Sequence, residues 1–206
     1  MANLDAYPLI GITVGDPSGI GPEIIVKALA QNPTELPIRP IVYSDRVVLE
    51  QTLRTLDLSL NLNPVTRPSD GCFVEGTLNF IDCRVVDKAV DFGKVSAVGG
   101  HAGFTYLDRA IEDALSGEVV GLATGPLNKE SLQAARLPFI DHTAVLKSKA
   151  AHRDPMTLFI TETLRIFFLT RHISFREIPD AITFEGIIDA LPLCELYLRQ
   201  LGIVTP

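Results

Sequence analysis

The sequence contains no tryptophan and only three cysteines among its 206 residues, Cys72, Cys83 and Cys194. An odd number of cysteines cannot pair off completely, and no two of them stand in the C-x-x-C pattern of structural zinc sites and redox pairs. The sequence therefore indicates neither a disulfide framework nor a zinc knot. We expect three reduced, half-buried thiols.

Positive charge is also scarce. The chain has 18 lysines and arginines against 25 aspartates and glutamates, a net charge of -7 and a pI near 5.1. Because nucleic acids and anionic membranes attract basic faces, this balance disfavours both as partners. The first ten residues, MANLDAYPLI, lack a basic targeting region, and no apolar run reaches membrane-spanning length. We expect a cytoplasmic protein with small-molecule partners, no nucleic acid and no membrane.

Apolar residues, by contrast, make up 47% of the chain. That is enough to bury a substantial core, as one large domain or two small ones. Apolar runs typical of strands alternate with helical patterns, which predicts an α/β fold with a largely parallel sheet and helices on both faces. The predicted strands are residues 9–14, 38–44, 77–83, 119–124, 156–161 and 165–170.

Local patterns add detail to this prediction. A helix with one apolar stripe is expected from Ser96 to Gly117. The last two strands are separated only by residues 162–164, too few for a parallel crossover, so we expect an antiparallel hairpin and a mixed sheet. The apolar run from Ile166 to Leu169 predicts that the second strand of this hairpin is buried. Residues 61–76, which contain Pro64, are predicted to form a long loop.

The segment GDPSGIGPE, residues 15–23, follows the first predicted strand and leads into a helix, with Pro22 suited to the first helical position. It matches neither common nucleotide loop, because the G-x-G-x-x-G spacing is not met and the Gly-Lys ending of the Walker loop is absent. Asp16 and Glu23 make the segment acidic, which suits a cation, an ammonium or a hydroxyl better than a phosphate. A glycine-rich turn without a ligand fits the pattern equally well.

Three further loops follow predicted strands, where ligands collect in open α/β sheets. Lys129, in ATGPLNKE, can neutralise an anion, assist a proton transfer or simply lie in solvent. His142 and Thr143 stand at the start of a predicted helix, beside a possible capping residue. His172 follows the last strand, a rigid mount for a metal-binding imidazole, although one histidine cannot make a metal site. No G-x-S-x-G or H-E-x-x-H motif is present, so hydrolase chemistry is not indicated.

The motifs GDPSGIGPE, ATGPLNKE, DHT and TRHISFREI, in this order and spacing, resemble the 4-hydroxythreonine-4-phosphate dehydrogenase family of vitamin B6 biosynthesis. The resemblance implies a fold like that of isocitrate and isopropylmalate dehydrogenases, and a homodimer. It also implies NAD or NADP as cofactor and a divalent metal, Zn, Mg or Co, held by three histidines. Such an enzyme oxidises the secondary alcohol of a 4-phosphorylated hydroxy acid, which we expect to be 4-hydroxy-L-threonine 4-phosphate, and the resulting β-keto acid loses carbon dioxide.

The resemblance also assigns roles to individual residues. His142 and Thr143 match the substrate-contacting pair of the family, and His172 matches its first metal-ligand histidine. The opening loop with Asp16 is expected on the substrate side of the cleft. Lys129, from its position after a strand, remains the candidate for proton transfer. Residues 1–206 are expected to be the N-terminal portion of a two-lobed dehydrogenase, because family members continue with a segment that carries the remaining metal, phosphate and nucleotide ligands. No cofactor-binding residue is assigned here.

Two departures from the family pattern leave alternatives open. Asp141 and Ala144 stand where the family has glycine and glutamate, so a threonate or erythronate 4-phosphate dehydrogenase and a dihydrodiol dehydrogenase are alternatives in substrate. The short chain allows an inactive, truncated binding module. A phosphate acetyltransferase-like enzyme shares a similar sheet, but histidines at strand ends disfavour it.

Overall fold

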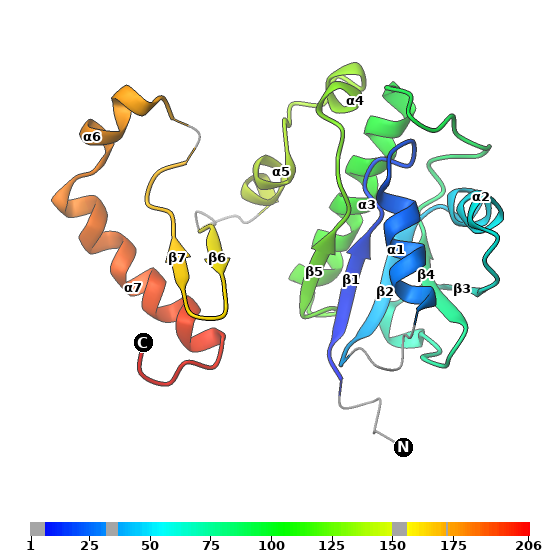
Figure 1. Ribbon diagram of the computed structural model, residues 1–206, viewed down its shortest axis with the longest axis horizontal. Coiled ribbons are helices and arrows are strands. Elements are labelled where there is room, and N and C mark those ends of the chain that lie inside the picture. Colours follow the sequence, from blue (N-terminus) through cyan, green and yellow to red (C-terminus); the bar gives the residue numbers. More distant parts are fainter. Residues whose placement is uncertain (1–6, 32–36, 150–155, 172) are drawn as a thin grey trace. The chain divides into compact units, whose positions relative to one another are not determined.

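The computed structural model describes residues 7–31, 37–149, 156–171 and 173–206 (Figure 1). The chain forms two compact units, residues 1–151 and residues 152–206. His152 and the predicted metal ligand His172 lie outside the described residues.

The first unit contains a five-stranded sheet in which every neighbouring pair is parallel. This confirms the predicted α/β class and the parallel arrangement of the first strands. The spatial order is β3-β4-β2-β1-β5. The strands are β1 (Leu9–Thr13), β2 (Arg39–Ser44), β3 (Asn61–Val65), β4 (Thr77–Asp82) and β5 (Gly121–Thr124).

Strand β3 was not predicted, because Pro64 lies inside it and residues 61–76 were expected to be a loop. The prediction was wrong for a physical reason. β3 is an edge strand that pairs only with β4 within the sheet. A proline, which has no N–H to donate, is tolerated on an edge strand. The rest of the segment contains only a short 3-10 turn, Pro68–Asp70.

Helices cover both faces of this sheet. α1 (Gly21–Ala30) and α2 (Arg46–Leu56) lie on one face, and α3 (Ala97–Leu115) lies on the other, against β1, β2 and β5 (Figure 1). The predicted bounds of α3 are confirmed, since the Ser96 side chain caps its start by accepting a hydrogen bond from Gly99 N at 2.9 Å. The chain turns away at Gly117, with φ of 82°. Two shorter helices follow β5, α4 (Lys129–Ala134) and α5 (His142–Lys149).

Two buried tyrosines tie the sheet to its helices. The hydroxyl of Tyr43 on β2 donates to Asp113 Oδ2 of α3 at 2.9 Å. The hydroxyl of Tyr106 on α3 donates to Asp45 Oδ2 at 2.6 Å. Burial is the main cause that raises the pKa of both tyrosines far above the ordinary value, so both stay protonated donors. Asp113 is only 7% exposed, because this bond holds its carboxylate against the sheet.

The buried carboxylate of Asp45 accepts several hydrogen bonds at once. It stands just before α2 and accepts hydrogen bonds from Val85 N at 3.0 Å, Val86 N at 2.7 Å and the Tyr106 hydroxyl. It therefore joins β2, the segment after β4 and α3. This one side chain satisfies donors that would otherwise be buried without partners.

Replacing Asp45 with alanine is expected to lower the free energy of unfolding by roughly 3 kcal/mol or more, since each orphaned buried donor costs about 1–3 kcal/mol. Urea denaturation followed by circular dichroism measures the change. Asp91→Ala is the matched control, because Asp91 is exposed. Equal effects of the two substitutions would show that the Asp45 network contributes little.

The second unit has a two-stranded sheet, β6 (Leu158–Ile160) and β7 (Arg165–Phe167), paired antiparallel, which confirms the predicted hairpin. The pair forms a sheet of its own. A 3-10 turn (Phe175–Glu177), α6 (Ile178–Ala181) and α7 (Phe184–Gln200) complete the unit. The predicted burial of the second strand was wrong, since Ile166 is 45% exposed. None of the described residues from 156 onward is buried, because one hairpin and two helices are too few to enclose a core.

All three cysteines are free thiols, as predicted. Cys83 and Cys194 are half-buried, whereas Cys72 is exposed, contrary to expectation. Burial raises the pKa of the Cys83 thiol to about 12. Among the described helices, none is both long and apolar enough to cross a bilayer.

Candidate active site at the ends of β1 and β5

Strands β1 and β5 are neighbours whose following segments lead to opposite faces of the sheet. β1 runs into α1 on one face, and β5 runs into α4, which packs against α3 of the other face (Figure 1). Such a topological switch point is where open α/β sheets bind their ligands, at the carboxyl ends of the strands. The motifs GDPSGIGPE and ATGPLNKE, distant in sequence, both reach this point.

Backbone hydrogen bonds hold the two loops together. Asp16 N donates to Pro126 O at 3.0 Å, and Gly125 N donates to Thr13 O at 2.7 Å. Gly15 has a φ of 74°, and a Cβ at this position would lie 2.2 Å from Pro126 O. Only glycine meets both conditions. The glycines of the opening motif thus serve the contact between the loops.

His142 is bound to the same loop. It is the first residue of α5, whose start is capped by Asp141, with Ala144 N donating to Asp141 Oδ1 at 2.9 Å. The half-buried imidazole places Nε2 3.0 Å from Gly125 O. Because a carbonyl oxygen can only accept, Nε2 carries the hydrogen, and in the neutral ring Nδ1 remains an acceptor. Such a ring can accept a hydrogen bond from a substrate hydroxyl.

Thr143 and Lys129 stand at the starts of the two short helices. Thr143 is half-buried in the first turn of α5. Lys129 is the first residue of α4, which Asn128 caps by accepting from Ser131 N at 2.9 Å. The Lys129 side chain is exposed, so its ammonium can move toward a ligand at the loop 125–128 or remain in solvent.

The structure gives Asp16 a buried position. Its side chain is 3% exposed and accepts a hydrogen bond from Ser18 N at 2.9 Å. A Cβ on Gly99 would lie 2.5 Å from Asp16 Oδ1, so the carboxylate faces the first turn of α3. The positive end of a helix stabilises a carboxylate there. This placement favours a role in holding the opening loop over direct contact with a substrate.

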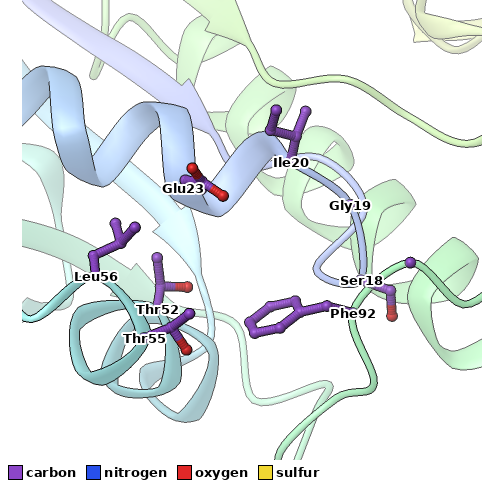
Figure 2. Close-up of a pocket in the computed structure, with 9 residues that line it drawn as sticks. Ser18, Gly19, Ile20, Glu23, Thr52, Thr55, Leu56 and Phe92 are labelled. Atoms are coloured by element: carbon purple, nitrogen blue, oxygen red, sulfur yellow. The ribbon is translucent and has the colours of Figure 1, made fainter.

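The opening loop also borders a cavity of about 310 Å³ that the sequence did not reveal. Figure 2 shows the Phe92 ring between the loop and the side chains of α2. The loop that carries Phe92 is fastened to the opening loop, because Gly93 N donates to Ser18 O at 2.8 Å. The lining residues are Ser18, Gly19, Ile20, Glu23, Thr52, Thr55, Leu56, Phe92 and Gly93.

The described residues form a complete site neither for a dinucleotide nor for a metal ion. The cavity lining contains Glu23 and no cationic residue, and Glu23 stands in the first turn of α1, where a pyrophosphate would otherwise bind. We therefore assign no residue here to the cofactor. The described part of the chain contains no group of three histidine, cysteine or carboxylate side chains placed to hold a metal ion. No catalytic step is assigned to a metal.

The sequence model of the family described as "Pyridoxal phosphate biosynthetic protein PdxA" matches residues 37–206. A protein of Symbiobacterium thermophilum with the printed name "Putative D-threonate 4-phosphate dehydrogenase" is 45% identical over 204 residues, 98% of this chain and 61% of the relative. A protein of the same printed name from Clostridium botulinum is 38% identical over 197 residues, 95% of this chain and 59% of the relative. The chain thus spans about 60% of the length of these curated relatives.

Solved structures agree with the sequence relatives. The 4-hydroxythreonine-4-phosphate dehydrogenase of Klebsiella pneumoniae superposes with a TM-score of 0.89 at 32% identity, covering 98% of this chain and 61% of that one. The enzyme of the same name from Burkholderia phymatum gives 0.89 at 30% identity, with 97% and 61% covered. A terephthalate 1,2-cis-dihydrodiol dehydrogenase of Burkholderia xenovorans, at 23% identity and a TM-score of 0.70, covers 97% of this chain and 60% of that one, and shares the fold.

Proposed function

The chain belongs to the family of the pyridoxal phosphate biosynthetic protein PdxA, and from this premise we propose that it forms the N-terminal part of an NAD(P)-dependent dehydrogenase acting on a 4-phosphorylated hydroxy acid. The observation that carries the proposal is the junction of β1 and β5, where the His142 ring lies 3.0 Å from Gly125 O in the loop bonded to Asp16. Relatives and structural neighbours that match nearly the whole chain are named dehydrogenases.

D-threonate 4-phosphate is the first candidate substrate. The relatives named for it reach 45% identity, whereas the structures named for 4-hydroxythreonine 4-phosphate reach 32%. The second candidate is 4-hydroxy-L-threonine 4-phosphate, which would place the enzyme in vitamin B6 biosynthesis. Both molecules are β-hydroxy acids with a secondary alcohol, so oxidation of that alcohol yields a β-keto acid that can lose carbon dioxide.

The proposal gives each site residue a task. His142 and Thr143 contact the substrate, and the acceptor Nδ1 of neutral His142 orients a substrate hydroxyl. The exposed ammonium of Lys129 neutralises an anionic substrate group or assists proton transfer. Asp16 was predicted to bind substrate, and its buried carboxylate supports a narrower task, in which it fixes the loop that forms the cleft wall.

The nicotinamide cofactor, NAD or NADP, accepts hydride when it is bound. We further propose a divalent ion, Zn, Mg or Co, with His172 as one ligand and the others outside residues 1–206, together with a homodimer in the cytoplasm. The family resemblance supports these assignments. The exposed apolar side chains of the second unit, Phe184 on α7 among them, are consistent with a further surface that covers them.

The assay of the full-length enzyme, meaning this chain continued to the length of its relatives, tests the proposed reaction. NAD(P)H formation at 340 nm is measured with each of the two substrates, with NAD and with NADP. We expect turnover with both substrates and a higher kcat/KM for D-threonate 4-phosphate. Reduction of neither cofactor with either substrate, by a folded protein, would contradict the proposal.

His172→Ala in the full-length enzyme is expected to lower bound metal and turnover together, because one of about three protein ligands is lost. Elemental mass spectrometry gives the metal content, and steady-state kinetics give kcat. His101→Ala, on the exposed side of α3, serves as the control. Full metal content and unchanged kcat in the His172 variant would exclude it as a ligand.

A further inference from the structure

The carboxyl ends of β3 and β4 border a second cavity, of about 480 Å³, whose lining is rich in arginine. It lies at the part of the sheet beside α2, away from β5 (Figure 1). Three guanidinium groups and one carboxylate line it, although the whole chain has a net charge of -7. The lining residues are Arg46, Pro64, Val65, Thr66, Ile81, Asp82, Arg84 and Arg109.

Two of these arginines are held in place by the core. The Arg46 guanidinium lies 5.4 Å from the centroid of the buried Phe80 ring, a cation–π distance. Arg109 Nε lies 3.4 Å from Asp113 Oδ2, and the buried Tyr43 hydroxyl fixes that carboxylate. A guanidinium positioned in advance loses less entropy when it binds a ligand.

The ion pairs made by the cavity arginines are long. Their nitrogen–oxygen distances fall between 3.4 and 3.7 Å, longer than the usual N–H···O hydrogen bond, although Arg109 Nε still donates a weak hydrogen bond to Asp113 Oδ2. By contrast, Arg67 and Glu118, outside this lining, approach to 2.7 Å. Since each guanidinium has five N–H donors, the long contacts leave donors for another oxyanion. The long pairs are Arg46–Glu50 at 3.6 Å, Arg84–Asp82 at 3.7 Å and Arg109–Asp113 at 3.4 Å.

The third arginine has an unusual backbone. Arg84, the second residue after β4, adopts a φ of 55°, a left-handed conformation that costs side-chain-bearing residues free energy. Its side chain is 85% exposed. Arg84 therefore adds an exposed guanidinium to the cavity lining, beside those of Arg46 on α2 and Arg109 on α3.

We propose that this cavity binds an oxyanion group, phosphate or carboxylate, of a small anionic metabolite. Planar guanidinium groups match both oxyanions in two-pronged hydrogen bonds. Arg46 and Arg109 hold the group from two elements, Arg84 closes on it from the third, and the Thr66 hydroxyl supplies a neutral donor. The cavity is larger than a bare oxyanion requires, so it also admits the carbon skeleton that carries the group.

Inorganic phosphate is the probe for the test. The ¹⁵N-labelled chain is titrated with sodium phosphate at pH 7 against sodium chloride of equal ionic strength, and backbone amide shifts are followed. We expect saturable shifts at Thr66 and at residues 82–84. Arg84→Gln should weaken phosphate binding at least about tenfold, the value of one charge-assisted hydrogen bond. A parallel titration with citrate distinguishes a carboxylate ligand from a phosphorylated one by which probe binds more tightly.

Arg54→Gln is the matched control, because it removes the same charge at an exposed residue of α2 that lies outside the cavity lining. It should leave the affinity unchanged. Arg109→Gln is the second variant, with Asp113 still bonded to Tyr43. The proposal is overturned if neither anion gives saturable shifts, or if Arg54→Gln weakens binding as much as Arg84→Gln. No readout requires dehydrogenase activity, so a failure of the proposed function leaves this test unaffected.

Discussion

Full-length enzyme carrying His142→Ala should lose about 100-fold or more in kcat/KM for its phosphorylated substrate, within the range of a lost acid–base or substrate-positioning group. The reason is the geometry of the ring, whose Nε2 is engaged by Gly125 O while Nδ1 of the neutral form remains an acceptor. Affinity for NAD(H), followed by nucleotide fluorescence, should change less than about twofold, because no cofactor contact is assigned to His142.

Two comparisons separate substrate contact from loop support. His142→Gln keeps an N–H donor for Gly125 O but lacks the second ring nitrogen, so it should be impaired like the alanine variant. His101→Ala changes a histidine on the exposed side of α3 and should behave as the unsubstituted enzyme. Weakened NAD(H) binding with intact substrate affinity would mean that the assigned roles are reversed.

Residues 1–206 alone should form no measurable NADH, even with excess divalent metal. Catalytic metal sites of this kind need about three protein ligands, and the described residues contain no such group. The relatives are longer than the matched region, since this chain spans 61% of the length of the Symbiobacterium protein. Correct positioning of the reactants can lower the barrier by roughly 7–11 kcal/mol. A chain that carries only part of the site should therefore lose nearly all of the activity.

The experiment compares purified residues 1–206 with the full-length enzyme on the same substrates. Circular dichroism confirms that the shorter chain is folded, and light scattering reports self-association through the exposed apolar residues of the second unit. Turnover within about tenfold of the full-length enzyme, equivalent to a barrier difference below about 1.4 kcal/mol, would contradict the expectation that residues 1–206 are not sufficient for catalysis.

Much of the first unit could be predicted because its pattern is local. Buried parallel strands appear in the sequence as continuous apolar runs. Ser96 and Gly117 mark the start and the end of α3. Strand β3 could not be predicted, because its position at the edge of the sheet depends on how all the strands assemble. Only that edge position makes Pro64 tolerable within a strand.

The candidate site divides in the same way. His142 could be found from its position after a strand, beside capping residues. Its bond to Gly125, and the bond of Asp16 to Pro126, depend on how distant loops meet at β1 and β5. The cavity beside Phe92 and the arginines at β3 and β4 likewise gather residues with no common motif. These features depend on contacts between segments that are far apart in the sequence, and such contacts are difficult to predict from one sequence alone.

The proposed function requires that His142 contacts the phosphorylated hydroxy acid. Imidazole ¹⁵N resonances of the full-length enzyme test it most directly, with the His142 signals assigned by their absence in His142→Gln. Adding D-threonate 4-phosphate should shift the Nδ1 signal of His142 with the substrate's own saturation curve, while the His101 signals stay in place. Unchanged His142 resonances in an enzyme that is saturated with substrate and turning it over would contradict the account.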